Sequence, residues 1–86
     1  MPERLRATRQ RAVGAKQTLR ALHSGNAKVV YVAGDADQRV VRPVETLARS
    51  ESGTEVVIIE SMSRLGRLCG IEVGAACAAI LGEKTT

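Results

Sequence analysis

Two almost unbroken apolar runs set the pattern of this 86-residue chain. Residues 28–33 read KVVYVA and residues 55–60 read EVVIIE. A strand with one solvated face alternates apolar and polar residues, so a continuous β-branched run predicts a strand covered on both faces. We therefore predict two buried strands and place the first at the centre of a sheet.

Segments with helical periodicity separate these runs. Residues 15–23 carry two leucines on one face, and Gly25 is a natural helix stop. Residues 38–50 carry an apolar stripe, but Pro43 cannot donate the amide hydrogen bond of a helix interior. We expect an initial turn and then a helix with Pro43 near its first position.

Local signals mark the remaining elements. Ser61 is a typical N-cap for a helix over residues 62–69, and Asp37 is a typical N-cap for the preceding helix. Residues 2–12 predict a short helix, with a frayed basic tail as the alternative. Residues 75–81 predict a last strand.

Strands that alternate with helices predict an α/β domain, in which a small sheet has helices on both faces. A chain of 86 residues supplies one modest core and is too short for two. We therefore predict a single domain over residues 1–82 and a disordered tail at residues 83–86.

The positive charge is concentrated at the N-terminus. Residues 1–20 hold six basic side chains and one acid, which gives +5, whereas residues 21–86 hold seven bases and eight acids. A basic face of this kind fits nucleic acid or an anionic membrane surface. No apolar run approaches the roughly 20 residues that span a bilayer, and no signal peptide is visible, so we predict a cytoplasmic protein.

The sequence offers no ligand set or nucleophile that indicates an enzyme. Cys69 and Cys77 are too few for a disulfide framework and lack partners for a zinc site, so we predict that both pack as small hydrophobic residues. Asp35 and Asp37 form a D-x-D pair, for which turn formation and helix capping are better interpretations than a metal site. We expect no cofactor and no metal, and a nucleotide-binding enzyme has no phosphate-loop or dinucleotide motif in its favour.

The start of the helix at residues 15–23 is the main candidate for a binding site. Lys16, Gln17 and Arg20 lie three or four residues apart, so a helix brings them onto one face. The free amides of the first turn point outwards, and a glycine before them permits a tight strand-to-helix corner. This combination indicates binding of phosphate and a base edge, and an ordinary solvated helix start is the alternative. We call the following residues the helix-start cluster: Gly14, Ala15, Lys16, Gln17 and Arg20.

The loop at residues 70–74 is the second candidate. Ile71 and Val73 flank Glu72 between two glycines, where a surface loop would normally be polar. The loop is either an edge of the core or a small apolar shelf for an unstacked nucleotide. Arg64, on the helix before the loop, is available to a partner.

Three segments resemble a known family. VGAKQTLRAL at 13–22, VVYVAGDAD at 29–37 and SRLGRLCGIEVGAACAAI at 63–80 are similar to the ribosomal protein L-seven-Ae and L-thirty-e family, in particular to its short bacterial kink-turn-binding members. The likeness covers residues 5–82. It implies a three-layer α-β-α sandwich with a four-stranded mixed sheet. It also implies binding of a kink-turn, which is an RNA stem with a bulge followed by tandem sheared G·A pairs.

The resemblance implies roles for single residues. Lys16 and Gln17 match the pair that reads the guanine edges of the G·A pairs, and Arg20 matches a basic residue directed to phosphate or a guanine edge. Ile71, Glu72 and Val73 match the loop that covers the looped-out nucleotides.

This chain departs from the pattern of the family at three positions. Archaeal members usually carry Asn-Glu in place of Lys16-Gln17, a change that favours affinity for the RNA backbone over base discrimination here. They often carry proline in place of Gly74, so a looser loop is expected. Some members carry arginine at the position of Ser24, and we expect that contact to be missing.

The predicted function is that of a non-enzymatic, monomeric and ribosomal-protein-like RNA-binding protein. The resemblance implies ribosomal RNA or a riboswitch stem as the kink-turn partner, and an association with the ribosome. The alternative is a protein-interaction module of the same fold that docks a partner through the 70–74 loop.

Overall fold

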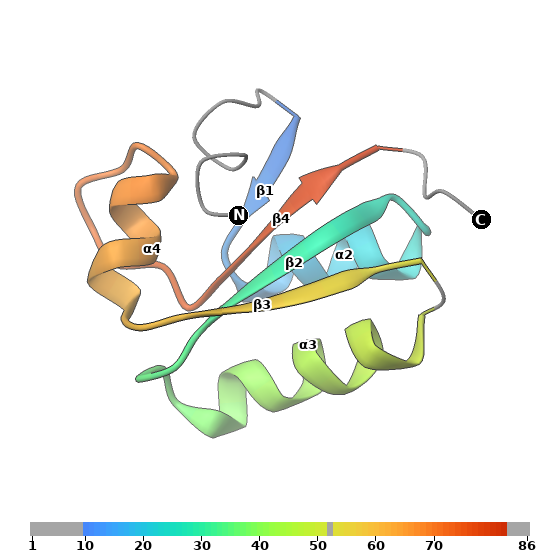
Figure 1. The fold of residues 1–86 in the computed structure, drawn as a ribbon, viewed down its shortest axis with the longest axis horizontal. Coiled ribbons are helices and arrows are strands. Elements are labelled where there is room, and N and C mark those ends of the chain that lie inside the picture. The colour runs from blue at the N-terminus through green and yellow to red at the C-terminus, as the bar shows by residue number, and fades with distance from the viewer. Residues whose placement is uncertain (1–9, 52, 83–86) are drawn as a thin grey trace.

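The computed structural model describes residues 10–51 and 53–82, which form helices around one sheet (Figure 1). The elements in chain order are β1 (Arg11–Val13), α2 (Ala15–His23), β2 (Ala27–Ala33), α3 (Gln38–Ser50), β3 (Glu55–Ile59), α4 (Met62–Leu68) and β4 (Cys77–Leu81). The predicted α/β class is confirmed. The predicted tail at residues 83–86 lies outside the described residues.

The sheet is mixed and has the strand order β1-β4-β2-β3. β4 is antiparallel to β1 and β2, whereas β2 and β3 are parallel, so β1, β2 and β3 all point in one direction. The register places Tyr31 of β2 between Ala78 of β4 and Val57 of β3. The prediction that residues 28–33 form a central strand is confirmed.

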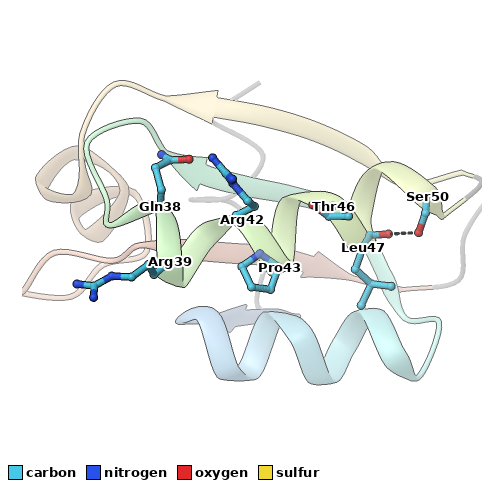
Figure 2. A pocket seen from close by; sticks show the side chains of 7 residues that line it. All are labelled: Gln38, Arg39, Arg42, Pro43, Thr46, Leu47 and Ser50. Atoms are coloured by element: carbon cyan, nitrogen blue, oxygen red, sulfur yellow. Dashed lines mark hydrogen bonds between the residues drawn. The ribbon is translucent and has the colours of Figure 1, made fainter.

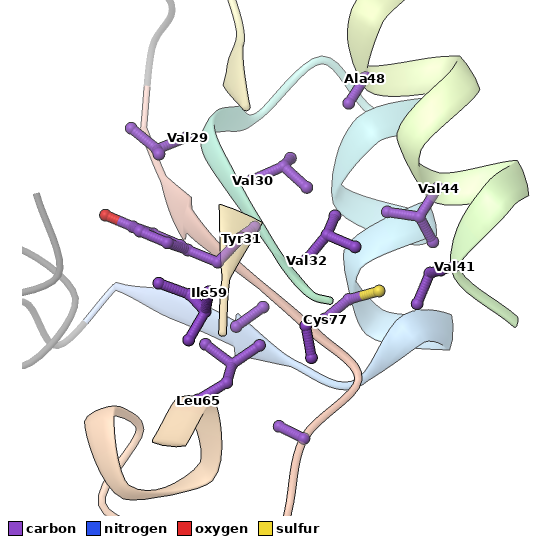
Figure 3. Close-up of a cluster of buried hydrophobic side chains, with 14 of the residues drawn as sticks. Val29, Val30, Tyr31, Val32, Val41, Val44, Ala48, Ile59, Leu65 and Cys77 are labelled. Atoms are coloured by element: carbon purple, nitrogen blue, oxygen red, sulfur yellow. The ribbon is translucent and has the colours of Figure 1, made fainter. Parts of the chain in front are cut away.

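Helices cover the sheet on both sides. α2 and α3 pack against each other on one face, and α4 packs against the other. The side chains of β2 alternate between the two layers (Figure 3): Val30 and Val32 point toward α2 and α3, and Tyr31 points to the side of Leu65. All four of these side chains are buried. The molecule is therefore the three-layer α-β-α sandwich that the resemblance implied.

The predicted helix over residues 2–12 is wrong at its end. Residues Arg11–Val13 form a strand, because their backbone pairs with β4 in the register Arg11↔Ile80. The local pattern of apolar residues cannot reveal a strand partner at the opposite end of the chain. Residues 2–9 of the predicted helix lie outside the described residues.

The prediction that residues 55–60 form a buried strand is wrong in part. A strand exists over Glu55–Ile59, but it lies at the edge of the sheet, and the Ile58 side chain is 54% exposed. A run of apolar residues is compatible with a buried strand. It does not determine whether the strand lies at the centre or at the edge of the sheet, and so how much of it other elements cover.

The predicted break at Pro43 is also wrong, because α3 is one continuous helix with Pro43 inside it. Val41 and Val44, on either side of the proline, are both buried. Pro43 and Arg39 are exposed, so water can hydrate the Arg39 carbonyl that the missing amide would have served. Burial of the valines on both sides of Pro43 outweighs the loss of that one hydrogen bond.

Two predicted helix caps are confirmed. Asp37 Oδ1 accepts the Arg39 N–H at 2.9 Å at the start of α3, and Ser61 Oγ accepts the Arg64 N–H at 3.0 Å at the start of α4. The Arg39 guanidinium also donates to Asp37, and these hydrogen bonds lower the pKa of the Asp37 carboxyl.

Both cysteines are free and buried, as predicted. Burial raises the pKa of both thiols, and that of Cys77 rises to about 11. Both thiols are therefore uncharged near neutral pH and pack as small hydrophobic groups. Cys77 is also the first residue of β4, which begins later than the predicted strand at residues 75–81.

Close contact between two glycines holds the 70–74 loop against α4. A Cβ added at Gly66 would collide with the Val73 carbonyl oxygen and would lie 3.1 Å from the Gly74 Cα. A Cβ added at Gly74 would lie 3.1 Å from the Met62 Cβ. The loop backbone therefore crosses the helix at a distance that a side chain on Gly66 would prevent.

We expect Gly66→Ala to destabilise the protein by about 1–3 kcal/mol, because the added methyl group forces the loop backbone away from α4. Helix propensity alone predicts the opposite sign, a gain of about 1 kcal/mol for alanine over glycine. Denaturant unfolding measures the difference.

Ser63→Ala is the matched control, since Ser63 is exposed on the same helix. It should change the free energy of unfolding by no more than about 0.5 kcal/mol. A Gly66→Ala variant as stable as the parent protein would show that the contact between α4 and the loop is not restrictive.

Candidate functional site

The described helices all begin at one edge of the sheet. This edge is the one formed by the C-terminal ends of β1, β2 and β3, and it is not an edge strand. α2 follows β1, α3 follows β2 and α4 follows β3, and these three strands point in the same direction. The 70–74 loop reaches the same edge, because it leads into β4, which runs the opposite way (Figure 1). The Gly14 N–H donates to the Cys77 carbonyl at 2.8 Å across this edge. The fold thus brings the two predicted sites to one edge.

Gly14 forms the corner between β1 and α2 with φ 102°, a conformation that L side chains rarely adopt. The Thr18 side chain is fully buried, and its hydroxyl donates to the Gly14 carbonyl at 2.8 Å, which fixes the first turn. Among the described residues, no side chain caps α2, and its first turn contains no acid. The partial positive charge of this helix start is therefore left for an external anion.

The polar side chains of the helix-start cluster are exposed. Within the described ranges, no hydrogen bond or ion pair engages the side chains of Lys16, Gln17 or Arg20. Gln17 and Arg20 line a hollow of about 360 Å³ between α2 and β1, and Lys16 lies outside it. The amide and one cation are therefore brought together over a concave surface.

Arg11 is a residue of this hollow that the sequence analysis did not identify. Its Nη2 atom would lie 3.6 Å from a Cβ built on Gly70, at the start of the loop. Its charge also opposes the effect of burial on the pKa of Cys69, although burial is the larger influence. Arg11 therefore borders this hollow and extends its guanidinium toward the start of the 70–74 loop. Recognition of this position required the pairing of β1 with β4, which local sequence does not reveal.

The 70–74 loop is divided between core and surface. Ile71 is half-buried and packs against the core, whereas Glu72 is exposed. Val73 is 70% exposed, the largest exposed fraction among the large hydrophobic side chains in the described part of the chain. Ile71 therefore fits the interpretation of the loop as an edge of the core, and Val73 is the apolar side chain that the loop exposes.

Arg64 is engaged in a weak ion pair. Its Nε atom lies 3.7 Å from Glu60 Oε1, and both side chains are largely exposed. Such a pair contributes about 0–1 kcal/mol and is screened by salt. An anionic partner can therefore compete for Arg64.

A larger hollow, of about 720 Å³, follows the outer face of α3 (Figure 2). Every residue that lines it comes from that helix, and none belongs to the helix-start cluster or the loop. Arg39, at one end, is paired with Asp37 at 3.0 Å. This surface does not collect convergent polar groups from several elements, as binding sites for small polar ligands do.

Two further findings apply to residues 10–51 and 53–82. Within these ranges, no helix is long and apolar enough to cross a membrane. The same ranges contain no group of three or more His, Cys, Asp or Glu residues that could hold a metal ion.

Comparison with known proteins places this geometry in a family. The sequence matches the model of the ribosomal protein L7Ae/L30e/S12e/Gadd45 family over residues 2–86. An RNA-binding protein of Caldanaerobacter subterraneus subsp. tengcongensis is 47% identical over 76 residues, which cover 87% of this chain and 92% of that protein. The large ribosomal subunit protein eL8 of Halobacterium salinarum is 41% identical over 69 residues, which cover 79% of this chain and 57% of that protein.

A solved structure agrees with these matches. The 15.5kD RNA binding protein of Giardia lamblia superposes with a TM-score of 0.81 at 26% sequence identity, over 95% of this chain and 68% of that one. The family model covers nearly the whole sequence, and the fold is that of the structural relative. The chain therefore belongs to the ribosomal protein L7Ae/L30e/S12e/Gadd45 family.

Proposed function

We propose that this protein is a non-enzymatic, ribosomal-protein-like RNA-binding protein that recognises and stabilises kink-turn RNA. The observation that carries the proposal is the pairing of an open, cationic helix start with an apolar loop at one edge of the sheet. The relatives named as RNA-binding proteins support an RNA partner. We propose ribosomal RNA or a riboswitch stem as that partner, with the protein acting as a monomer in the cytoplasm.

The helix-start cluster supplies the polar contacts. Gln17 can donate and accept hydrogen bonds, so it suits the edge of a guanine in a sheared G·A pair. Lys16 and Arg20 lie on the same side of α2 and are exposed, so they suit phosphates or a guanine edge. The open amides of the first turn add an electrostatic attraction for phosphate.

The 70–74 loop supplies the apolar contact. The exposed Val73 side chain offers a surface on which an unstacked nucleotide can rest, while the half-buried Ile71 anchors the loop to the core. In this proposal the protein binds the kinked conformation better than the extended one and shifts the RNA toward it. No chemical step is involved.

A titration at fixed moderate salt tests this proposal. We expect a kink-turn RNA to bind at least about a hundredfold more tightly than the same stem with both G·A pairs replaced by Watson–Crick pairs. A factor of that size is about 2.7 kcal/mol, which one or two base-edge contacts can supply.

Equal and salt-sensitive binding to both RNAs would show that the protein binds RNA only through non-specific electrostatic attraction, and it would contradict the proposal. If neither RNA binds, and mutation of Val73 instead abolishes the binding of a protein partner, the 70–74 loop is a protein-docking site.

Two variants separate the roles within the helix-start cluster. Gln17→Ala should weaken binding to the kink-turn RNA by about 1–3 kcal/mol and leave the Watson–Crick stem almost unaffected, because a base-edge contact is lost. Arg20→Ala should weaken binding to both RNAs if its main contact is to phosphate. The ratio of the two affinities, measured for each variant, gives the result.

Arg49→Ala is the control for the loss of one positive charge, since Arg49 is paired with Glu45 on α3 and lies outside the cluster. It should change neither affinity by more than about twofold. If Gln17→Ala and Arg20→Ala weaken both RNAs equally, this division of roles is wrong.

A further inference from the structure

Asp35 connects the turn after β2 to the first residue of α4. Its Oδ1 atom accepts the Met62 N–H at 2.8 Å, although the two residues are 27 positions apart. The Met62 carbonyl in turn accepts the Ala75 N–H at 3.0 Å, directly after the 70–74 loop. Gly74 also packs against Met62. Met62 thus has the carboxylate on one side and the end of the loop on the other.

We propose that Asp35 is a positioning residue for the 70–74 loop, acting through Met62. The carboxylate holds the start of α4, and the Met62 carbonyl then holds the loop in the conformation that receives the looped-out nucleotides. This inference rests on the proposed kink-turn function for its RNA readout. The hydrogen-bonded link itself is a property of the free protein.

The dependence on Asp35 follows from the length of α4. A helix of seven residues is marginal on its own, so the satisfaction of its first amides matters. The Ser61 side chain accepts the Arg64 N–H, and the Asp35 side chain accepts the Met62 N–H. Loss of Asp35 leaves the Met62 amide to solvent, so the first turn of α4 frays and the acceptor of the Ala75 N–H moves with it.

Asp37, two residues further along, has a different role. It caps α3 and is paired with Arg39, and within the described residues its side-chain hydrogen bonds are to Arg39 and do not extend to α4 or to the loop. The two carboxylates of the D-x-D motif therefore serve two different helices. Asp37 is a matched control, because its removal changes the charge by the same amount in the same turn.

The experiment compares Asp35→Ala, Asp35→Asn and Asp37→Ala. All three remove one negative charge, so the general attraction for RNA changes alike in each. Asparagine retains an oxygen that can accept the Met62 N–H, whereas alanine does not. Asp35 is exposed, so none of the changes creates a cavity in the core.

The first measurement is amide hydrogen exchange in the free protein. Asp35→Ala should increase the exchange rate of the Ala75 amide about fivefold, the factor that corresponds to loss of a typical helix cap. Asp35→Asn and Asp37→Ala should leave that rate within about twofold of the parent protein. An unchanged Ala75 rate in Asp35→Ala, or an equal increase in Asp35→Asn, would overturn the proposal.

The second measurement is affinity for a kink-turn RNA with and without its looped-out nucleotides. Compared with Asp37→Ala, which loses the same charge, Asp35→Ala should bind the complete RNA about fivefold more weakly and the shortened RNA equally well, because the shortened RNA contacts the helix-start cluster alone. An equal loss on both RNAs would show a general loss of structure and overturn the positioning role. If the parent protein has no preference for the kink-turn, the proposed function fails, while the exchange measurement still decides whether Asp35 holds the loop.

Discussion

Burial of β2 on both faces is the constraint on which the rest of the structure depends. Six of its seven residues are buried, so the strand requires a layer of helix on each side and a strand on each flank. β1, β2 and β3 point in the same direction, and each is followed by a helix. The starts of α2, α3 and α4 consequently meet at one edge of the sheet. A requirement of the core thus decides where the positive ends of the helices gather.

The three helix starts differ in whether side chains cap their first amides. Asp37 caps α3, and Ser61 together with Asp35 satisfies amides of α4, whereas α2 begins on a glycine and no described side chain caps it. Lys16 extends into solvent at the start of α2, and Arg20 is exposed one turn further along the same helix. Two starts are therefore neutralised by the protein itself, and the third adds to the local positive charge. Electrostatic attraction for an anion is for this reason concentrated at α2 rather than spread along the edge.

The sequence predicts the features that depend on neighbouring residues. The caps at Asp37 and Ser61 and the central strand at residues 28–33 follow from side-chain type and spacing, and the structure confirms them. Local sequence does not predict features that depend on residues far away in the chain. β3 lies at the edge because of the strand order, and Arg11 lies in a strand because β4 pairs with it. Within the candidate site, the shared face of Gln17 and Arg20 follows from helical spacing, whereas the position of Arg11 near Gly70 follows only from the complete sheet.

The same distinction applies to the loop. A looser loop is expected because Gly74 stands where archaeal members of the family often carry proline, whose fixed φ restricts the backbone. From sequence alone, glycine at this position implies a looser loop. In the structure, Gly74 packs against Met62, the adjacent Val73 carbonyl lies against Gly66, and the Ala75 N–H is bonded to Met62. Tertiary contacts therefore restrain the backbone at the point where the residue itself does not. Because these contacts all involve α4, the conformation of the loop depends on how firmly the start of that helix is held.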